Sequence, residues 1–216
     1  MTGTKNLSRG LAAGGPVVLD KPWLQVRPGS GRPRRDAAQS FFLRTARLGF
    51  RRWSPDDLPL AIGLWGDPAV TRFIDARPRL SDDDVKRVLA RHIETQGSYG
   101  VQYWPVFLVP AGELAGCCGL RPYDHANAIY EFGVHLRPAY WGRGLAQEAA
   151  SAVMDYAFGG LGASALFAGH HPGNNASRHL LNKLGFQYTH TQHYAATGLG
   201  HPSYMRTRGM APIRFL

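Results

Sequence analysis

Residues 140–149 have the sequence Tyr-Trp-Gly-Arg-Gly-Leu-Ala-Gln-Glu-Ala, in which two glycines stand between a predicted strand and a predicted helix. The strand is indicated by the pattern of residues 130–136. The helix is indicated by apolar residues at i, i+3, i+4, i+7, i+8 and i+11 from Ala146 to Ala157, which form one stripe. A glycine-bearing turn at a helix start leaves backbone N–H groups free at the positive end of the helix. This stretch therefore favours an anion such as phosphate.

The spacing of the glycines does not match two common nucleotide-binding motifs. Gly142 and Gly144 fit the first two positions of the dinucleotide motif, but Gln147 stands where the third glycine belongs. The lysine and hydroxyl residue of a P-loop are also missing. What remains is a pyrophosphate cradle of backbone N–H groups from Gly142 to Ala146, to which Arg143 adds charge. A helix start without any ligand explains the spacing equally well.

The same residues resemble the coenzyme A pyrophosphate motif of the GNAT superfamily of N-acetyltransferases. A second stretch resembles the second helix of that family and contains Asn174-Asn175-Ala176-Ser177, Leu180, Lys183, Leu184, Gly185 and Phe186. The start of the region is similar to the RimJ/RimL-like branch, which acetylates ribosomal-protein N-termini, through Thr45-Ala46-Arg47-Leu48, Asp67-Pro68, Phe73 and Glu113-Leu114-Ala115-Gly116. The resemblance covers residues 44–208 and is carried by the joint order of these motifs.

The resemblance implies a GNAT fold, an α/β domain whose mixed, splayed central sheet of about seven strands is flanked by helices. The predicted elements agree with it: a strand at 47–53, helices, a meander of three strands, then helix, strand, helix and two strands. The splay is expected between the strands at 128–136 and 164–168. We expect this single domain to span residues 42–210, preceded by a basic, Gly- and Pro-rich extension over residues 1–41 that is partly disordered.

The resemblance also implies acetyl-CoA as co-substrate. The backbone at the end of the strand would meet the pantetheine arm through Val134, His135 and Leu136. The turn and the helix start would hold the pyrophosphate through Trp141, Gly142, Arg143, Gly144, Leu145, Ala146 and Gln147. Asn174 would lie near the arm and the thiol. Trp141 departs from the family pattern, in which Gln or Arg is commonest, but backbone N–H groups make the contacts at this position.

The implied reaction is direct attack of an amine on the acetyl thioester in a ternary complex, for which the amine must be neutral. An alkylamine of pKa about 10.4 is neutral in roughly one molecule per thousand at pH 7, a cost of about 4–5 kcal/mol, whereas an α-amino group near pKa 8 costs about 1 kcal/mol. Glu131 is the predicted base and acts through a water. A carboxylate that positions substrate or pairs with an arginine is an equal alternative for Glu131, and His135 is a weaker candidate base.

The group that reprotonates the departing thiolate is a separate question. The tyrosine that many GNAT enzymes use on the second helix is replaced here by Leu181. Ser177 is therefore the predicted proton donor; the alternative role of its hydroxyl is to cap the start of the helix. A backbone N–H near Val134 is expected to stabilise the thioester oxygen as charge develops on it.

Composition sets further bounds. The 216 residues are 44% hydrophobic and 19% charged, which is typical of a globular domain. We find no pattern of a transmembrane helix or a secretory signal, and we interpret the adjacent Cys117 and Cys118 as small strand residues, so we expect a cytoplasmic protein. The histidine pairs at 170–171 and 190–193 lack further ligands, so no metal is expected. A monomer and a homodimer are both compatible with the sequence.

Three functions remain to be compared. The leading prediction is an acetyl-CoA-dependent N-acetyltransferase that acts on a protein N-terminus or a small-molecule amine. The alternative is a non-catalytic, acyl-CoA-binding module of the same fold, against which Gly142, Gly144, Ala146 and Asn174 argue. The formal charge of +10, half of which lies in residues 1–40, raises nucleic-acid binding as a third and less favoured hypothesis.

Overall fold

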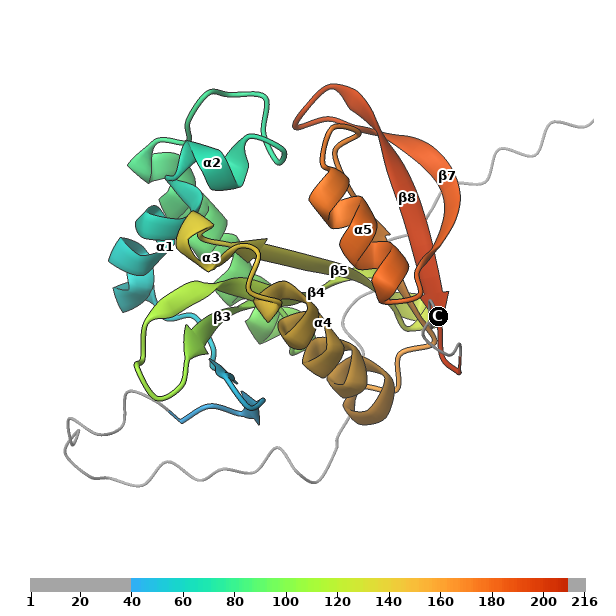
Figure 1. The fold of residues 1–216 in the computed structure, drawn as a ribbon, viewed down its shortest axis with the longest axis horizontal. Helices are drawn as coiled ribbons and strands as arrows, with labels where there is room; N and C mark the ends of the chain where they lie inside the picture. The colour runs from blue at the N-terminus through green and yellow to red at the C-terminus, as the bar shows by residue number, and fades with distance from the viewer. Residues whose placement is uncertain (1–39, 210–216) are drawn as a thin grey trace, which may run out of the picture. The chain divides into compact units, whose positions relative to one another are not determined.

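The computed structural model describes residues 40–209, which belong to one compact unit (Figure 1). Its strands are β1 (Leu43–Arg44), β2 (Leu48–Phe50), β3 (Tyr103–Leu108), β4 (Leu114–Asp124), β5 (Ile129–Leu136), β6 (Ala165–Gly169), β7 (Gln187–Tyr194) and β8 (Leu199–Thr207). Its helices are α1 (Leu58–Trp65), α2 (Pro68–Thr71), α3 (Asp82–Tyr99), α4 (Leu145–Asp155) and α5 (Asn175–Lys183). The extension predicted at 1–41 falls almost wholly outside the described residues and stays a prediction.

The sheet has eight strands in the order β1-β2-β3-β4-β5-β6-β8-β7. Neighbouring strands are antiparallel except β5 and β6, which are parallel. This mixed α/β sheet confirms the predicted fold class. Each helix in the part of the chain that the structure describes is too short or too polar to cross a membrane.

The start of the sheet differs from the prediction. Only β2 forms within the predicted strand at 47–53, and the short strand β1 precedes it across a tight turn, so the sheet has eight strands rather than about seven. The Thr45 hydroxyl accepts the backbone N–H of Leu48 at 3.0 Å, and the Thr45 N–H donates to the Leu48 carbonyl at 2.9 Å. After Phe50 the chain leaves the sheet, because Pro55–Asp57 begin a helical turn at Ser54.

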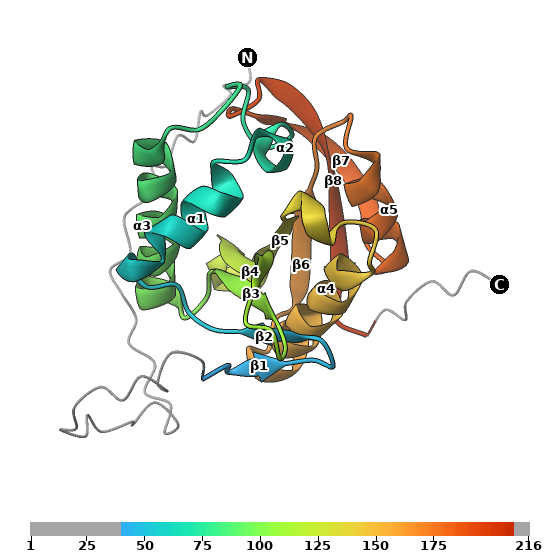
Figure 2. The same cartoon turned by 60° about the vertical axis from the view of Figure 1, so that its left-hand side comes forward.

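Helices cover both faces of the sheet (Figure 2). On one face α1 and α3 form a buried cluster with β3 and β4, whose members include Ala61, Leu64, Val85, Leu89, Tyr103, Phe107 and Cys117. On the other face α4 packs through its predicted apolar stripe, whose buried members are Ala149, Ala150, Val153, Met154 and Ala157. Removing these side chains from water is the main source of stability on both faces.

The sheet opens between β5 and β6. These strands pair only from Ile129, opposite Ala165, to Glu131, opposite Phe167. Residues 132–136 stay paired with β4 but have no strand on their other side among residues 40–209. Figure 1 shows β5 and the β7–β8 pair running apart. The splay therefore lies where the resemblance implied it.

Candidate active site

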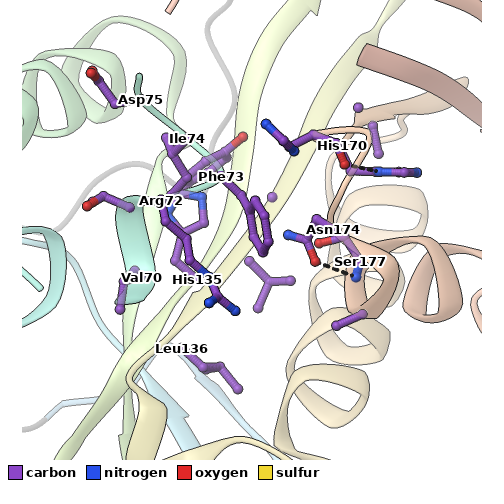
Figure 3. Close-up of a pocket in the computed structure, with 18 of the residues that line it drawn as sticks. Val70, Arg72, Phe73, Ile74, Asp75, His135, Leu136, His170, Asn174 and Ser177 are labelled. Atoms are coloured by element: carbon purple, nitrogen blue, oxygen red, sulfur yellow. Dashed lines mark hydrogen bonds between the residues drawn. The ribbon is translucent and has the colours of Figure 1, made fainter. Parts of the chain in front are cut away.

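A cavity of about 900 Å³ lies at this splay, within the usual size range of small-molecule sites. It is bordered by the open edge of β5, the starts of α4 and α5, α2 with the loop that follows it, and one face of α3. Figure 3 shows Arg72, Phe73 and His135 toward one side of the cavity and Asn174 and Ser177 toward the other. Segments far apart in the sequence thus share one site.

The start of α4 has the form of an anion cradle. Gly142 and Gly144 adopt φ values of 71° and 74°, the left-handed region that glycine enters without strain. Among residues 40–209, the backbone N–H groups of residues 142–147 find no acceptor, as expected at a helix start. The Trp141 indole donates to the Leu136 carbonyl at 2.8 Å and so ties the loop to the end of β5. These N–H groups, at the positive end of α4, are available to a phosphate.

Arg47 and Glu148, which we call the Arg47–Glu148 clamp, form a charged pair next to this cradle. The Glu148 carboxylate accepts hydrogen bonds from the Thr45 hydroxyl at 2.5 Å, from the Arg47 backbone N–H at 3.0 Å and from the Arg47 Nε at 2.6 Å. The Arg47 Nη1 donates to the Arg143 carbonyl at 3.1 Å. Burial raises the pKa of Glu148, but the hydrogen bonds from Thr45 and Arg47 together lower it by more than burial raises it. The pKa of Glu148 therefore lies below its usual value. The clamp therefore joins the first hairpin to the cradle.

Glu131 stands where β5 separates from β6, and its carboxylate lines the cavity. Its Oε1 accepts from Arg121 Nη2 at 2.6 Å and from the Tyr103 hydroxyl at 3.3 Å. Oε2 has no hydrogen bond within the described chain and is not enclosed. Gly133 makes room for this arrangement, because a Cβ there would lie 2.4 Å from the Tyr103 ring. One carboxylate oxygen is thus held in an ion pair, while the other is left without a hydrogen-bond partner among residues 40–209.

His135 shares a face of β5 with Glu131, because the pairing of β5 with β4 is regular over this stretch. Its Nδ1 lies 3.2 Å from the Trp65 indole nitrogen, which can only donate, so Nδ1 accepts and the proton of the neutral ring is on Nε2. Burial, with a smaller contribution from Arg121, lowers the pKa of His135 to about 4. A neutral ring whose basic nitrogen is occupied is poorly suited to take a proton.

The start of α5 completes the site. The Asn174 Oδ1 accepts the Ser177 backbone N–H at 3.1 Å, so the asparagine caps the helix. The Ser177 hydroxyl has no hydrogen-bond partner within residues 40–209, and the alternative in which it caps the helix is therefore wrong. Leu181 is buried in the core.

Two cysteines lie outside the cavity, whereas His170 lines it. Cys117 and Cys118 are buried and unpaired in β4. His170 bonds to the His171 carbonyl at 2.8 Å and lies 3.2 Å from the Tyr204 hydroxyl. In residues 40–209 we find no group of three or more His, Cys, Asp or Glu placed to hold a metal ion.

Comparison with known proteins bears on this geometry. The family model described as an acetyltransferase (GNAT) domain matches residues 47–187. The chain belongs to the GNAT family. The GNAT fold and the acyltransferase class predicted from the sequence are thereby confirmed.

Three relatives illustrate its place in the GNAT family. The uncharacterized N-acetyltransferase p20 of Bacillus licheniformis is 31% identical over 146 residues, which cover 67% of this chain and 82% of p20. Spermidine N(1)-acetyltransferase of Escherichia coli is 37% identical over 132 residues, or 61% of this chain and 68% of that enzyme. The structure of RimL, a ribosomal-protein alpha-N-acetyltransferase in complex with coenzyme A, has a TM-score of 0.65 at 16% identity and covers 76% of this chain and 95% of RimL, which is a likeness of fold.

Most of the predicted site residues line the cavity, namely Glu131, Val134, His135, Leu136, Trp141, Gly142, Gly144, Leu145, Ala146, Asn174 and Ser177. Arg143 and Gln147 do not line it. Sequence reasoning did not identify Arg47, Arg72 or Arg121 as part of the site. Arg121 lies directly opposite Glu131 in the pairing of β4 with β5, a register that the structure shows.

Proposed function

We propose that this GNAT protein transfers the acetyl group of acetyl-CoA to a primary amine, either a protein N-terminus or a small-molecule amine. One observation carries the proposal: the open edge of β5 has the free N–H groups of residues 142–147 beyond one end and Glu131 at the other. A thioester held along that edge would have an anion cradle for its phosphates and a carboxylate near its acetyl end. A module that only binds acyl-CoA would have no use for a carboxylate that lines the cavity.

The residues present fit coenzyme A. The unpaired edge of residues 132–136 offers backbone groups to the amides of pantetheine. The N–H groups at the start of α4 suit the pyrophosphate, and the Arg143 guanidinium, which has no ion pair within residues 40–209, adds charge nearby. The coenzyme A complex of RimL, whose fold is similar, supports the same cofactor here.

Acetyl-CoA would supply an acetyl thioester, which a neutral amine attacks directly in a ternary complex. The Glu131 Oε2 would take a proton from the ammonium form through a water, while Arg121 and Tyr103 hold Oε1 in place. The Ser177 hydroxyl, free of other partners among residues 40–209, would give its proton to the departing thiolate and take up the proton that the attacking nitrogen loses, so that the serine ends the step protonated. A backbone N–H near Val134 would stabilise negative charge on the carbonyl oxygen.

The RimJ/RimL-like assignment belongs to this proposal. The likeness of fold to RimL and the Thr45–Leu48 start support it, and the spermidine acetyltransferase relative supports an amine acceptor of some kind. An α-amino acceptor needs less help from a base than an alkylamine does, because more of it is neutral at pH 7. An α-amino acceptor therefore needs only a weak base, and a carboxylate such as Glu131, with one oxygen held in an ion pair, is sufficient for it.

The test is release of coenzyme A thiol from acetyl-CoA across a panel of alkylamines, amino acids and N-terminal peptides. Amine-dependent release with at least one acceptor is expected, together with the acetylated amine by mass spectrometry. Acetyl-CoA affinity is measured in parallel by calorimetry. Tight binding without release across the whole panel would favour the non-catalytic module, and absence of binding would refute the cofactor assignment.

A further inference from the structure

The charges that line the cavity are unbalanced. Five arginines and three acidic side chains border it, a formal excess of two positive charges. The histidines that line it can only add positive charge when they take up protons. The residues of the cofactor cradle that line the cavity, from Trp141 to Ala146, carry no charge, so the excess of positive charge lies outside the cradle.

Each of the three acids already has an arginine. Glu131 pairs with Arg121 at 2.6 Å, and Asp75 pairs with Arg77 at 2.8 Å. Asp84 pairs with Arg77 at 2.8 Å and with Arg87 at 2.6 Å. The Ser81 hydroxyl and Arg77 hold the pKa of Asp84 below its usual range, and Arg77 does the same for Asp75, so both remain carboxylates. No acidic side chain of the cavity is left for a second cation.

Two arginines of the cavity have no acidic partner within residues 40–209. Arg72 follows α2, and its guanidinium stacks 4.7 Å from the Phe73 ring centre; Figure 3 shows it extending toward His135 and Leu136. Arg91 lies one turn after Arg87 on the face of α3 that borders the cavity. Neither of them appears in an ion pair.

We propose that the acceptor amine carries a carboxylate, which Arg72 and Arg91 bind, and that a polyamine is a poor acceptor. The inference rests on the acetyl transfer proposed above and specifies its substrate class. A cleft lined by an excess of one charge concentrates ligands of the opposite charge, and a planar guanidinium binds a carboxylate through two parallel hydrogen bonds. A polyamine would bring several ammonium groups to carboxylates that arginines already occupy. This chain would then differ in acceptor from the spermidine acetyltransferase it resembles.

The experiment compares amines matched in length, using the full chain and saturating acetyl-CoA. For chains of two to six carbons, the ω-amino acid, the neutral monoamine and the diamine are assayed by thiol release, with spermidine added. Peptides that begin Ser-Glu, Ser-Gln and Ser-Lys, with free α-amino acids, separate a peptide source of the carboxylate from a small molecule. We expect kcat/KM for the best carboxylate-bearing acceptor to exceed that of its neutral match by about tenfold or more, and that of its cationic match by more still.

Variants separate binding from a general loss of activity. In Arg72→Gln and Arg91→Gln, KM for the carboxylate-bearing acceptor should rise about tenfold while KM for its neutral match changes little. Arg79→Gln is the control, because Arg79 lies in the same loop but does not line the cavity. Calorimetric titration of acceptor into protein with coenzyme A, where no turnover occurs, should show the same loss of affinity.

Two results would overturn the inference while acetyl transfer stands: a diamine or spermidine used as well as the carboxylate-bearing amines, or an equal effect of both variants on all acceptors. Absence of thiol release with every amine would refute acetyl transfer itself, and this inference with it.

Discussion

At Glu131 the two oxygens of one carboxylate have different surroundings. Oε1 is held by Arg121 and Tyr103, whereas Oε2 has no hydrogen bond within the described residues. An ion pair on one oxygen fixes the side chain without occupying its second acceptor. This arrangement is compatible with both roles considered for Glu131, since pairing with an arginine and taking up a proton through a water can involve different atoms.

Glu131→Gln should lower kcat for an alkylamine by about 10²–10⁴ and for an N-terminal peptide by less, because the α-amino group is more often neutral at pH 7. The rates are measured by thiol release between pH 6 and pH 10. Acetyl-CoA affinity and thermal unfolding serve as controls for an intact site. A variant with the parent rate at every pH would show that Glu131 is not the base.

Gly133 sets the position of Tyr103 and can be tested against a second glycine. A Cβ at Gly133 would lie 2.4 Å from the Tyr103 ring, so Gly133→Ala should destabilise the protein by about 1–3 kcal/mol. Gly97 lies within α3 with open space around it, so Gly97→Ala should stabilise the protein by about 0.5–1 kcal/mol. Urea unfolding of the two variants measures the contrast. Equal effects would mean that the Tyr103 contact is unimportant.

Among the elements, the Arg47–Glu148 clamp connects the first hairpin to the cradle at the start of α4. Neither side chain lines the cavity, so both act by positioning the cradle. The ion pair is partly exposed, 51% at Arg47 and 20% at Glu148, so its contribution to overall stability is small.

Arg47→Gln and Glu148→Gln should each raise KM for acetyl-CoA by about three- to tenfold with little change in kcat, because the cradle loses its support. The double variant should resemble either single one, since both substitutions break the same interaction. Initial-rate kinetics with calorimetric affinities for coenzyme A would check this. Additive effects would argue that the two residues act independently.

Elements whose ends are marked by capping residues, prolines or glycines could be predicted from the sequence. The helix α1 has clear local signals in the sequence, because Ser54, two prolines and Gly66 mark its ends. β1 was not predicted, because the turn that pairs it with β2 depends on a side-chain hydrogen bond of Thr45, for which the sequence pattern has no strong marker. The cradle was predictable because it is contiguous, whereas the partners of Glu131 and the loop bearing Arg72 depend on strand register and tertiary packing.

For the molecule as a whole, two histidines with lowered pKa values, the buried His92 and the half-buried His135, link stability to pH. His92 stacks on Trp65 with ring centres 5.1 Å apart, and burial, with a smaller contribution from Arg121, lowers its pKa to about 3. His135 has a pKa of about 4 for the same reason. Both are neutral in the folded protein and have an ordinary pKa of about 6.5 when unfolded. Below about pH 6.5 the unfolded chain therefore binds more protons than the folded one.

The free energy of unfolding should thus fall as pH drops from about 6.5 toward 4, by at most about 1.4 kcal/mol per pH unit for each histidine. Urea unfolding at pH 7.5, 6 and 5 measures the slope. His92→Phe, which keeps an aromatic ring on Trp65, should reduce the slope by about half, because one of the two protons is removed. An unchanged slope in this variant would place the pH dependence elsewhere.

The three-residue pairing of β5 with β6 has a consequence for solvent exchange. Residues 132–136 form a strand edge inside the protein that no other strand of the described chain covers, so amide protons that point into the opening exchange with deuterium unless a ligand bonds them. Coenzyme A should therefore slow deuterium uptake in this segment, as measured by mass spectrometry, and leave β3 and its partner β4 unchanged. The backbone groups on this edge of residues 132–136 have no strand partner, and a bound ligand would supply the hydrogen bonds that a neighbouring strand supplies elsewhere in the sheet.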